Sequence, residues 1–359
     1  MERKKYKLSD LLTIKNGRDY KHLEEGNIPV FGSGGYMLSR SSFLYDKPSI
    51  LLPRKGTLSN IQYYNKGKFW TVDTCFYSII NDELCDGYYL YRYLRNLDLS
   101  RYDTGASIPS MTQKTYNKIK VFLPSLPTQQ KISSILSSYD RLIENNTRRI
   151  RLLEQMAENL YKEWFVRFRF PEHEKVEMVN GLPKGWKINS LKEICEFKRG
   201  RNITSAEMCD GIIQVISAGV APSGYHNKAN VHGVSVTMSS SGANAGYISI
   251  HYDDIWAADC SYISEKETED IYYVYELLNN IRQVINNFQI GAAQPHVYPK
   301  DINRIKTCVP PKELRIKANT NLSKIHKEIH KLYKQNQLLT HQRDLLLPRL
   351  MSGKLEVKS

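Results

Sequence analysis

The longest regular pattern of apolar and polar positions in the chain covers residues 128–164. Apolar side chains recur there in steps of three and four, the heptad pattern of a helix that packs lengthwise on another helix. Such a helix would be roughly 55 Å long. A second heptad pattern begins near Pro311. The predicted seam of the helix pair consists of Leu136, Tyr139, Ile143, Ile150, Leu153, Leu160, Leu322, Ile325, Ile329, Leu332, Leu339 and Leu346.

Polar residues and prolines interrupt these patterns and predict local features. The seam positions Asn146, Asn336 and Arg343 are expected to fix the register of the two helices. Thr128 is a candidate N-cap of the first helix, and Pro171 is expected to end it. Pro348 is expected to kink or end the second helix. Trp164 and Phe165 are expected to face a docked protein rather than the partner helix.

An internal repeat includes both heptad patterns. A shift of 186 residues superimposes Gly56, Trp70, Asp73, Pro109, Lys114 and Lys120 on Gly242, Trp256, Asp259, Pro295, Lys300 and Lys306. Near the start of each half, the shift is 183 residues and superimposes Lys15, Gly17 and Arg18 on Lys198, Gly200 and Arg201. The segments between these positions differ in length and composition. The repeat therefore predicts one scaffold that carries two different recognition surfaces.

Short β-branched and aromatic runs between Gly-rich turns predict strands in each half. The expected fold class is α+β: two mixed globular domains, each followed by a long helix. The helices are expected to form an antiparallel, coiled-coil-like pair with pseudo-twofold symmetry. Packing of each helix on its own domain, or on another chain, remains an alternative. The expected boundaries are 1–126 for the first domain, 127–170 for the central helix, 171–182 for a linker, 183–310 for the second domain and 311–355 for the C-terminal helix.

The formal net charge of +14 favours a polyanionic partner such as nucleic acid. The charge is uneven: residues 1–125 and 311–359 each carry +7, whereas residues 126–179 carry +1 and residues 180–310 carry −1. No signal peptide is recognisable, and no apolar run approaches the length of a membrane span. The six cysteines form no CxxC pair. We therefore expect a cytoplasmic protein with reduced thiols and no membrane partner.

Searches for catalytic motifs fail. The chain has no Walker A sequence, no GxGxxG after a strand, no Asn-Pro-Pro-Tyr-like element and no Pro-Asp dipeptide. His326 and His330 have the spacing of a metal pair but lack a third ligand, so they are expected to be solvated or to face DNA. Asp73 and Asp259 occur once per repeat and are expected to stabilise turns. We predict no catalytic residue, metal or cofactor in this chain.

Basic and amide side chains in the predicted loops are candidates for DNA contact. Lysine and arginine can bind phosphates or read guanine, and glutamine suits adenine. A solvated basic turn remains the alternative for each position. The candidates are Lys15, Arg18, Arg40, Arg54, Lys55, Lys198, Arg199, Arg201, Asn244, Gln294 and His296.

Four strings resemble segments of one known family, the specificity (S) subunits of type I restriction-modification systems. They are LPSLPTQQKI (123–132), NLYKEWFVRFRFP (159–171), GLPKGWK (181–187) and RDLLLPRLMSGKL (343–355). The predicted layout of two target recognition domains and two long helices also resembles this family. The second helix departs from the pattern, because its start, PPKELRIKAN, lacks the glutamine-rich entry of the first.

The resemblance implies a non-catalytic chain that reads an asymmetric bipartite site in double-stranded DNA. It also implies two methyltransferase subunits, which use S-adenosylmethionine, and motor-nuclease subunits, which use ATP and Mg²⁺. The helix pair would then act as spacer and docking platform. Two alternatives belong to other classes: a single-chain nuclease or methyltransferase, and a protein scaffold that binds DNA incidentally.

Overall fold

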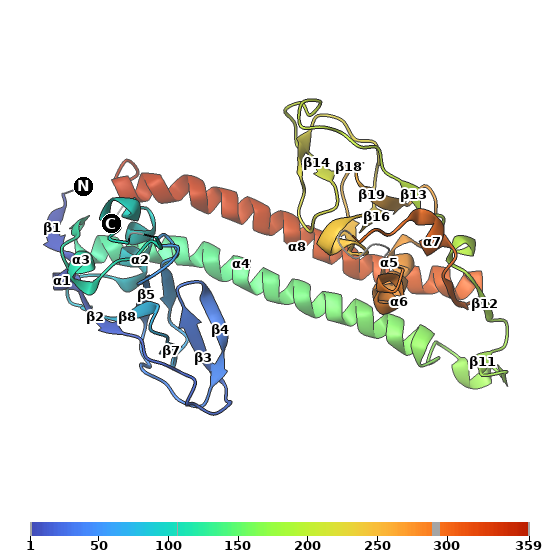
Figure 1. Ribbon diagram of the computed structural model, residues 1–359, viewed down its shortest axis with the longest axis horizontal. Coiled ribbons are helices and arrows are strands. Elements are labelled where there is room, and N and C mark those ends of the chain that lie inside the picture. Colours follow the sequence, from blue (N-terminus) through green and yellow to red (C-terminus); the bar gives the residue numbers. More distant parts are fainter. Residues whose placement is uncertain (1, 106, 289–294, 358–359) are drawn as a thin grey trace. The chain divides into compact units, whose positions relative to one another are not determined.

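The computed structural model describes residues 2–105, 107–288 and 295–357, and it contains two compact units (Figure 1). The first unit comprises Met1–Glu144 and Gln337–Ser359, and the second comprises Asn145–Asn336. Both divisions fall inside long helices, so each unit contains one globular domain together with parts of both helices.

Short strands and helices build the domain of the first unit. The strands are β1 (Lys4–Lys7), β2 (Leu12–Asn16), β3 (Ile28–Gly32), β4 (Gly35–Arg40), β5 (Ser49–Pro53), β6 (Gln62–Tyr64), β7 (Trp70–Thr71), β8 (Cys75–Ile80) and β9 (Lys120–Leu123), and the helices are α1 (Leu8–Leu11), α2 (Gly87–Arg95) and α3 (Gln113–Asn117). They form sheets in the orders β2-β8-β5-β6, β4-β3-β7 and β1-β9. Every residue of β5 is buried, as expected for an apolar strand with a neighbour on each side.

The second unit repeats this topology. Its strands are β10 (Met178–Val179), β11 (Leu182–Pro183), β12 (Lys187–Ser190), β13 (Lys198–Arg199), β14 (Ile213–Ile216), β15 (Gly224–His226), β16 (Ser235–Ser239), β17 (Ile248–His251), β18 (Ile255–Ala257), β19 (Cys260–Ser264) and β20 (Lys306–Val309), and its short helices are α5 (Ile271–Asn280), α6 (Arg282–Asn286) and α7 (Pro299–Asn303). The sheet orders β13-β19-β16-β17, β15-β14-β18 and β12-β20 correspond one to one with those of the first unit. In both units, the three-stranded sheet combines one parallel and one antiparallel pairing.

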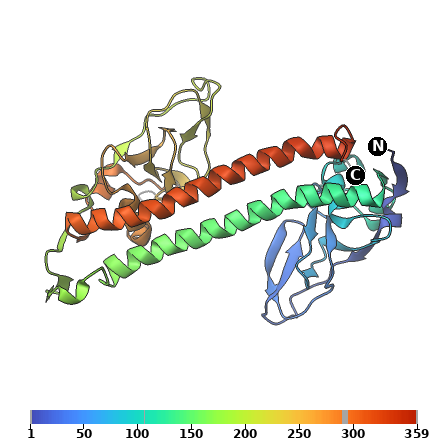
Figure 2. The ribbon, with the colours of Figure 1, turned by 180° about the vertical axis from the view of Figure 1, so that it is seen from behind.

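Two long helices follow the domains. Helix α4 spans Leu126–Tyr161 and continues into a π-helical turn, Lys162–Val166, and helix α8 spans Lys312–Ser352. Within the first unit, the start of α4 and the end of α8 share one apolar core with the domain. Within the second unit, the end of α4 and the start of α8 do the same (Figure 2). The pairing is therefore antiparallel, and each helix packs both on its partner helix and on a domain.

The predicted seam positions are all at least half-buried. Leu136, Ile150, Leu322, Ile325, Ile329 and Leu332 are buried, and the remaining six are intermediate. Asn146 is only 3% exposed, and its amide donates to the side-chain oxygens of Gln335 and Asn336 at 3.1 and 3.0 Å. Asn336 donates in turn to Thr147 at 3.3 Å. These side-chain hydrogen bonds connect α4 to α8 within the second unit.

The helix ends differ in part from the sequence prediction. Helix α4 begins at Leu126, so Ser125 precedes it and Thr128 lies inside its first turn rather than at the N-cap. Pro127 is compatible with this start because first-turn N–H groups have no intrahelical acceptor. Helix α8 does not end at Pro348 but includes this exposed residue and continues to Ser352.

Two predictions about exposure are wrong. Trp164 and Phe165 are 8% and 6% exposed and pack with aromatic residues of their own unit, not on a surface for another protein. His326 is 2% exposed, not solvated, because the domain of the second unit covers this face of α8. Its ring lies between tyrosines, with 2.9 Å between Nδ1 and the Tyr252 hydroxyl and 3.2 Å between Nε2 and Glu276.

Among the described residues, no helix is both long enough and apolar enough to cross a bilayer.

Candidate nucleic-acid interface

In the first unit, hydrogen bonds bring together three segments, two of which carry predicted DNA-binding residues. The indole N–H of Trp70 donates to the carbonyl of Arg18 at 2.9 Å, and the Arg18 N–H donates to Thr71 O at 2.9 Å. A side chain at Gly17 would meet the carbonyl oxygen of Val72 at 2.0 Å, so only glycine permits this approach. The chain at Arg18 is thus fixed, and its side chain is exposed.

The neighbouring loops complete this surface. Arg54 N–H donates to Thr74 O at 2.8 Å, Lys55 forms a β-bridge with Ser110, and Gly56 N–H donates to Pro109 O at 2.8 Å. Arg54 and Lys55 are exposed. We call the segments around Arg18, Arg54–Gly56 and residues 107–111 the first loop cluster.

One carboxylate helps to order the first loop cluster. Asp103 accepts 2.8 Å hydrogen bonds from the backbone N–H groups of Gly105 and Ser110. These hydrogen bonds hold the pKa of Asp103 below its usual range. Asp103 is therefore ionised at neutral pH and partly offsets the positive charge of the cluster.

The second unit contains the same contacts at the repeated positions. The indole N–H of Trp256 donates to Arg201 O at 2.8 Å, and Arg201 N–H donates to Ala257 O at 2.9 Å. Ser241 forms a β-bridge with His296, and Gly242 N–H donates to Pro295 O at 3.0 Å. We call the segments around Arg201, Ser241–Asn244 and Pro295–His296 the second loop cluster.

The two clusters share a backbone but present different side chains. Lys55 in the first unit corresponds to Ser241 in the second, whose hydroxyl donates to Asp259 at 2.7 Å. Asp259 therefore has a hydrogen-bonded partner within the fold. Asn244 is exposed and His296 is half-buried, with its ring stacked on Tyr298. The second cluster therefore adds an amide and an imidazole, and has a serine where the first has Lys55.

Other predicted residues lie outside these contacts or have partners. Lys15 is exposed on β2, and Arg199 is exposed on β13. Arg40 belongs to the three-stranded sheet, where its guanidinium lies over the Tyr20 ring. Lys198 forms a 2.9 Å ion pair with Glu267, and this hydrogen bond raises the pKa of Lys198. Gln294 lies outside the described residues.

A hollow of 210 Å³ in the second unit is lined by β14, β16, β17 and the loop at 217–222. Its polar lining includes Thr237, Ser239, Ser249 and His251, and no lysine or arginine among the residues described. His251 Nε2 lies 2.8 Å from the Thr237 hydroxyl, and burial lowers the pKa of His251 to about 4. The imidazole is therefore neutral at physiological pH, so this hollow is not a phosphate site.

Within the described residues, no group of three or more His, Cys, Asp or Glu side chains is arranged to hold a metal ion. His330 lies 3.5 Å from Asp253 and stacks on Tyr252, while His326 belongs to the core. Both histidines contact Tyr252 and have structural partners.

Two copies of one α+β skeleton, each presenting a different loop cluster, define a duplicated recognition protein. The sequence model of the family described as "Type I restriction modification DNA specificity domain" matches residues 2–155 and 183–344. The chain therefore belongs to the family of type I restriction-modification DNA specificity subunits, as its strings and layout indicated.

Individual relatives agree with this assignment. The chain is similar to the type I restriction enzyme MjaIX specificity subunit of Methanocaldococcus jannaschii, with 25% identity over 354 residues, 88% of this chain and 79% of that protein. The MjaVIII specificity subunit of the same organism is 23% identical over 308 residues, which cover 77% of this chain and 72% of that protein. The crystal structure of a type I restriction-modification S subunit from M. genitalium has the same fold, with a TM-score of 0.72 at 20% identity over 97% of this chain and 96% of that chain.

Proposed function

We propose how this chain performs the DNA sequence recognition that defines its family. Each unit reads one half of an asymmetric, bipartite site in double-stranded DNA through its loop cluster. Helices α4 and α8 set the spacing between the two half-sites and serve as the docking platform for two methyltransferase subunits.

The observation that supports this proposal is the repeated backbone of the two loop clusters. The hydrogen bonds from Trp70 to Arg18 and from Gly56 to Pro109 recur as those from Trp256 to Arg201 and from Gly242 to Pro295. Because the skeleton holds equivalent loops in the same way, differences in the side chains become differences in what each unit binds.

The chemistry of the side chains suggests two dissimilar half-sites. Arg18, Arg54 and Lys55 carry charged donors that suit phosphates and the major-groove edge of guanine. Asn244 and His296 offer amide and imidazole groups in the same cluster as Arg201, a set suited to a different base sequence.

Methylome sequencing of cells with and without this gene tests the recognition. One asymmetric motif, two specified blocks separated by unspecified bases, should be lost when the gene is deleted. A single continuous or palindromic motif would contradict the assignment of one unit to each half-site.

An insertion experiment tests the spacer. Four residues added after Glu144 in α4 and after Asn336 in α8 would lengthen each helix by about 6 Å. The hydrogen bonds that Asn146 donates to Gln335 and Asn336 join residues between the two insertion sites, so they stay within the second unit. The spacer should lengthen by about one or two base pairs while both half-sites stay unchanged. Altered half-sites would refute the spacer role.

Exposed apolar side chains on the helices support the docking role. In the first unit, α4 exposes Ile135 and Leu142, and α8 exposes Leu338 and Leu345, with 36–62% of each side chain accessible. In the second unit, Leu152, Met156, Ile316 and Tyr333 are likewise exposed on the same two helices. Such residues suit burial in a protein interface.

The variant Leu142→Glu/Leu345→Glu tests docking in the first unit. It should reduce co-purification of the methyltransferase from two copies per chain to one. The control Gln130→Glu/Gln342→Glu adds the same charge at exposed positions of the same helices and should leave two copies bound. Equal retention of methyltransferase by both variants would exclude these apolar residues from the interface.

We also infer that the chain itself catalyses no reaction. The purified chain, incubated with DNA, S-adenosylmethionine, ATP and Mg²⁺, should neither methylate nor cleave its substrate. Activity under these conditions would favour a single-chain enzyme. A chain that joins methyltransferase subunits but binds its own site no better than random duplex would instead be a protein scaffold.

A further inference from the structure

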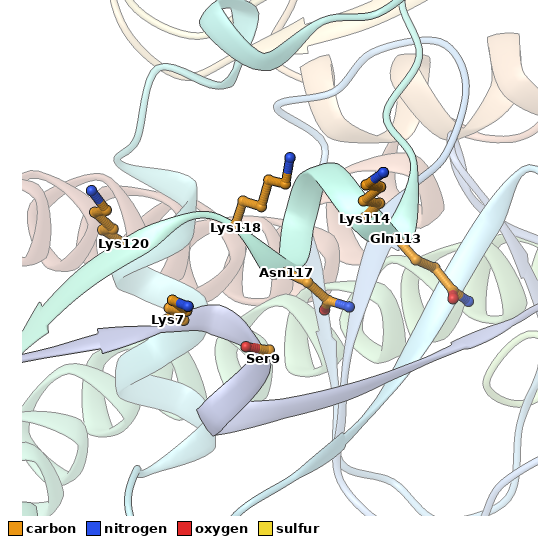
Figure 3. Close-up of a pocket in the computed structure, with 7 residues that line it drawn as sticks. All are labelled: Lys7, Ser9, Gln113, Lys114, Asn117, Lys118 and Lys120. Carbon is orange, nitrogen blue, oxygen red and sulfur yellow. The ribbon is translucent and has the colours of Figure 1, made fainter.

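A hollow of 670 Å³ on the first unit has a strongly basic lining (Figure 3). It is lined by Lys7, Ser9, Gln113, Lys114, Asn117, Lys118 and Lys120. The four lysines, which we call the first basic cluster, are exposed, and among the described residues none of them forms an ion pair. Among the residues described, no carboxylate lines this hollow, so the cluster presents four positive charges without a counter-charge in that lining.

A polar group at the same place has unused hydrogen-bonding capacity. The side-chain oxygen of Asn117 is buried without a hydrogen-bond partner. Figure 3 shows this amide beside Gln113 and Ser9, on the segment that also carries Lys114 and Lys118. That oxygen is an acceptor and cannot bind an anion itself, but the amide N–H groups of Asn117 and the hydroxyl of Ser9 can donate to one.

The basic positions recur in the second unit. By the repeat, Lys114, Lys118 and Lys120 correspond to Lys300, Arg304 and Lys306, and Ser9 corresponds to Lys192. We call Lys192, Lys300, Arg304 and Lys306 the second basic cluster, and all four are exposed. Strand pairing keeps the register, because Lys7 pairs with Lys120 as Ser190 pairs with Lys306.

The basic clusters differ from the loops in that their charged positions recur in both units. Of the recurring basic residues, two lie on the helices α3 and α7, two directly follow these helices, and two lie on the strands β9 and β20, all parts of the repeated skeleton. A feature kept in both units, while the loops differ, suits contact with something common to both half-sites. The sugar-phosphate backbone is common to every DNA sequence, whereas the base edges are not.

Each basic cluster also continues from its loop cluster. In the first unit, Gln113 Nε2 donates to Asn16 at 3.1 Å, close to Arg18, and Met111 N–H donates to Arg54 O at 3.0 Å. In the second unit, His296 stacks on Tyr298, and the Lys300 ammonium lies 5.6 Å from the centre of the same ring. Bases read by the loops would thus have phosphates within reach of the lysines.

We propose that the two basic clusters bind the DNA backbone on the flank of each half-site and add affinity without sequence preference. This proposal rests on the proposed function, since it assumes that the loop clusters face DNA. Lysine suits the role because its ammonium is a compact charge that needs no bidentate geometry. The tyrosine beneath Lys300 limits the motion of that side chain.

The test compares two triple variants of the full chain, each purified with its methyltransferase. Lys114→Gln/Lys118→Gln/Lys120→Gln removes three charges from the first basic cluster. Lys21→Gln/Lys47→Gln/Lys131→Gln removes three exposed charges elsewhere in the same unit. Binding is measured across a salt series on a duplex with the methylome-derived site and on a scrambled duplex.

The cluster variant should reduce the slope of log affinity against log salt by about 0.9 per lysine, on both duplexes, and leave their affinity ratio unchanged. The control should keep most of the slope, and Lys→Arg at the three cluster positions should restore it. A changed affinity ratio would make the lysines base-reading groups, and an unchanged slope with loss of the methyltransferase would make them a protein contact. Either result overturns the proposal. A wild-type chain that does not distinguish the two duplexes would instead refute the proposed function.

Discussion

The ionic network around Asp140 gives the most quantitative prediction for the first unit. This α4 carboxylate accepts hydrogen bonds from Tyr88 and Arg92 of α2, and from Arg343 of α8 at 2.7 Å. Arg92 Nε also donates to the Tyr88 hydroxyl at 2.9 Å. One side chain therefore joins the recognition domain to both long helices.

The expected cost of Asp140→Asn follows from the burial of its partners. The side chains of Arg92, Arg343 and Asp140 are 8%, 19% and 30% exposed. Removing one partner of a fully buried ion pair costs about 3–5 kcal/mol, because the remaining charge is left uncompensated. Since Asp140 is partly solvated, we expect a loss of about 2–3 kcal/mol, or about 5–10 °C in Tm for a unit of this size.

Differential scanning calorimetry of the full chain measures this change. Glu144→Gln is the control, because Glu144 and its partner Lys66 are 63% and 61% exposed and the pair should contribute less than about 1 kcal/mol. Adding Arg343→Met to Asp140→Asn should recover part of the loss, since it removes one uncompensated cation. An Asp140→Asn protein that melts within a degree of the wild type would refute the reasoning.

The pH dependence of the same network has a defined sign. Burial tends to raise the pKa of Asp140, but hydrogen bonds from Tyr88 and Arg343 and the charge of Arg92 outweigh it and lower the pKa below its usual range. A lowered carboxyl pKa contributes stability above the unfolded value of about 3.9, and this is lost as the pH falls through the folded pKa. The Tm difference between wild type and Asp140→Asn should thus be constant near neutrality and shrink only in acid.

Three further predictions concern the second unit and the loop clusters. Asn146→Leu should raise Tm but allow mixed helix pairings, because the side-chain hydrogen bonds from Asn146 to α8 are lost. Mixed pairings would be visible as oligomers in light scattering, and a single monomeric species would contradict this. With a pKa lowered to about 4 by burial, His251 should destabilise the fold as the pH falls from about 6.5 toward 4, by at most about 3 kcal/mol, and His251→Gln should remove this slope in acid titration. Gly200→Ala would place a methyl 2.3 Å from Ala258 O, and Gly17→Ala would place one 2.0 Å from Val72 O. Methylome sequencing should therefore show that each variant loses sequence specificity in a different half-site. Loss of both half-sites in either variant would contradict independent recognition.

The repeat explains why so much of the fold follows from the sequence. Trp70 and Trp256 match in the sequence because each indole N–H closes the same loop in its unit. Gly17 and Gly200 match because each lies against a carbonyl that excludes a side chain. The same backbone conformation requires the same residue in both units. Comparing the sequences of the two halves therefore identifies these positions without a structure.

The two wrong predictions about exposure share one physical cause. A heptad pattern assumes that a helix has a single partner, whereas α4 and α8 each contact a partner helix and a domain. Positions beside the seam are therefore buried as well, including His326 of α8 and Gln129 of α4. Trp164 and Phe165 are buried for the same reason.

The network around Asp140 was beyond sequence reasoning for a different reason. Its partners Arg92 and Arg343 are 48 and 203 residues away in the chain, so no local sequence pattern connects them to Asp140. The loop residues are difficult to predict for a related reason. The repeat locates the loops, but a comparison of the two halves does not indicate the function of side chains that differ between them.

The contrast between what is repeated and what is not repeated also divides the functions of the chain. Under the proposed function, basic positions of the skeleton that recur, such as Lys114 with Lys300 and Lys120 with Lys306, suit contact with something that both half-sites share. Positions that differ, such as Lys55 and Ser241, can distinguish one half-site from the other. Exchanging Lys55 and Ser241 between the units should therefore alter the bases specified, whereas exchanging Lys118 and Arg304 should alter neither half-site.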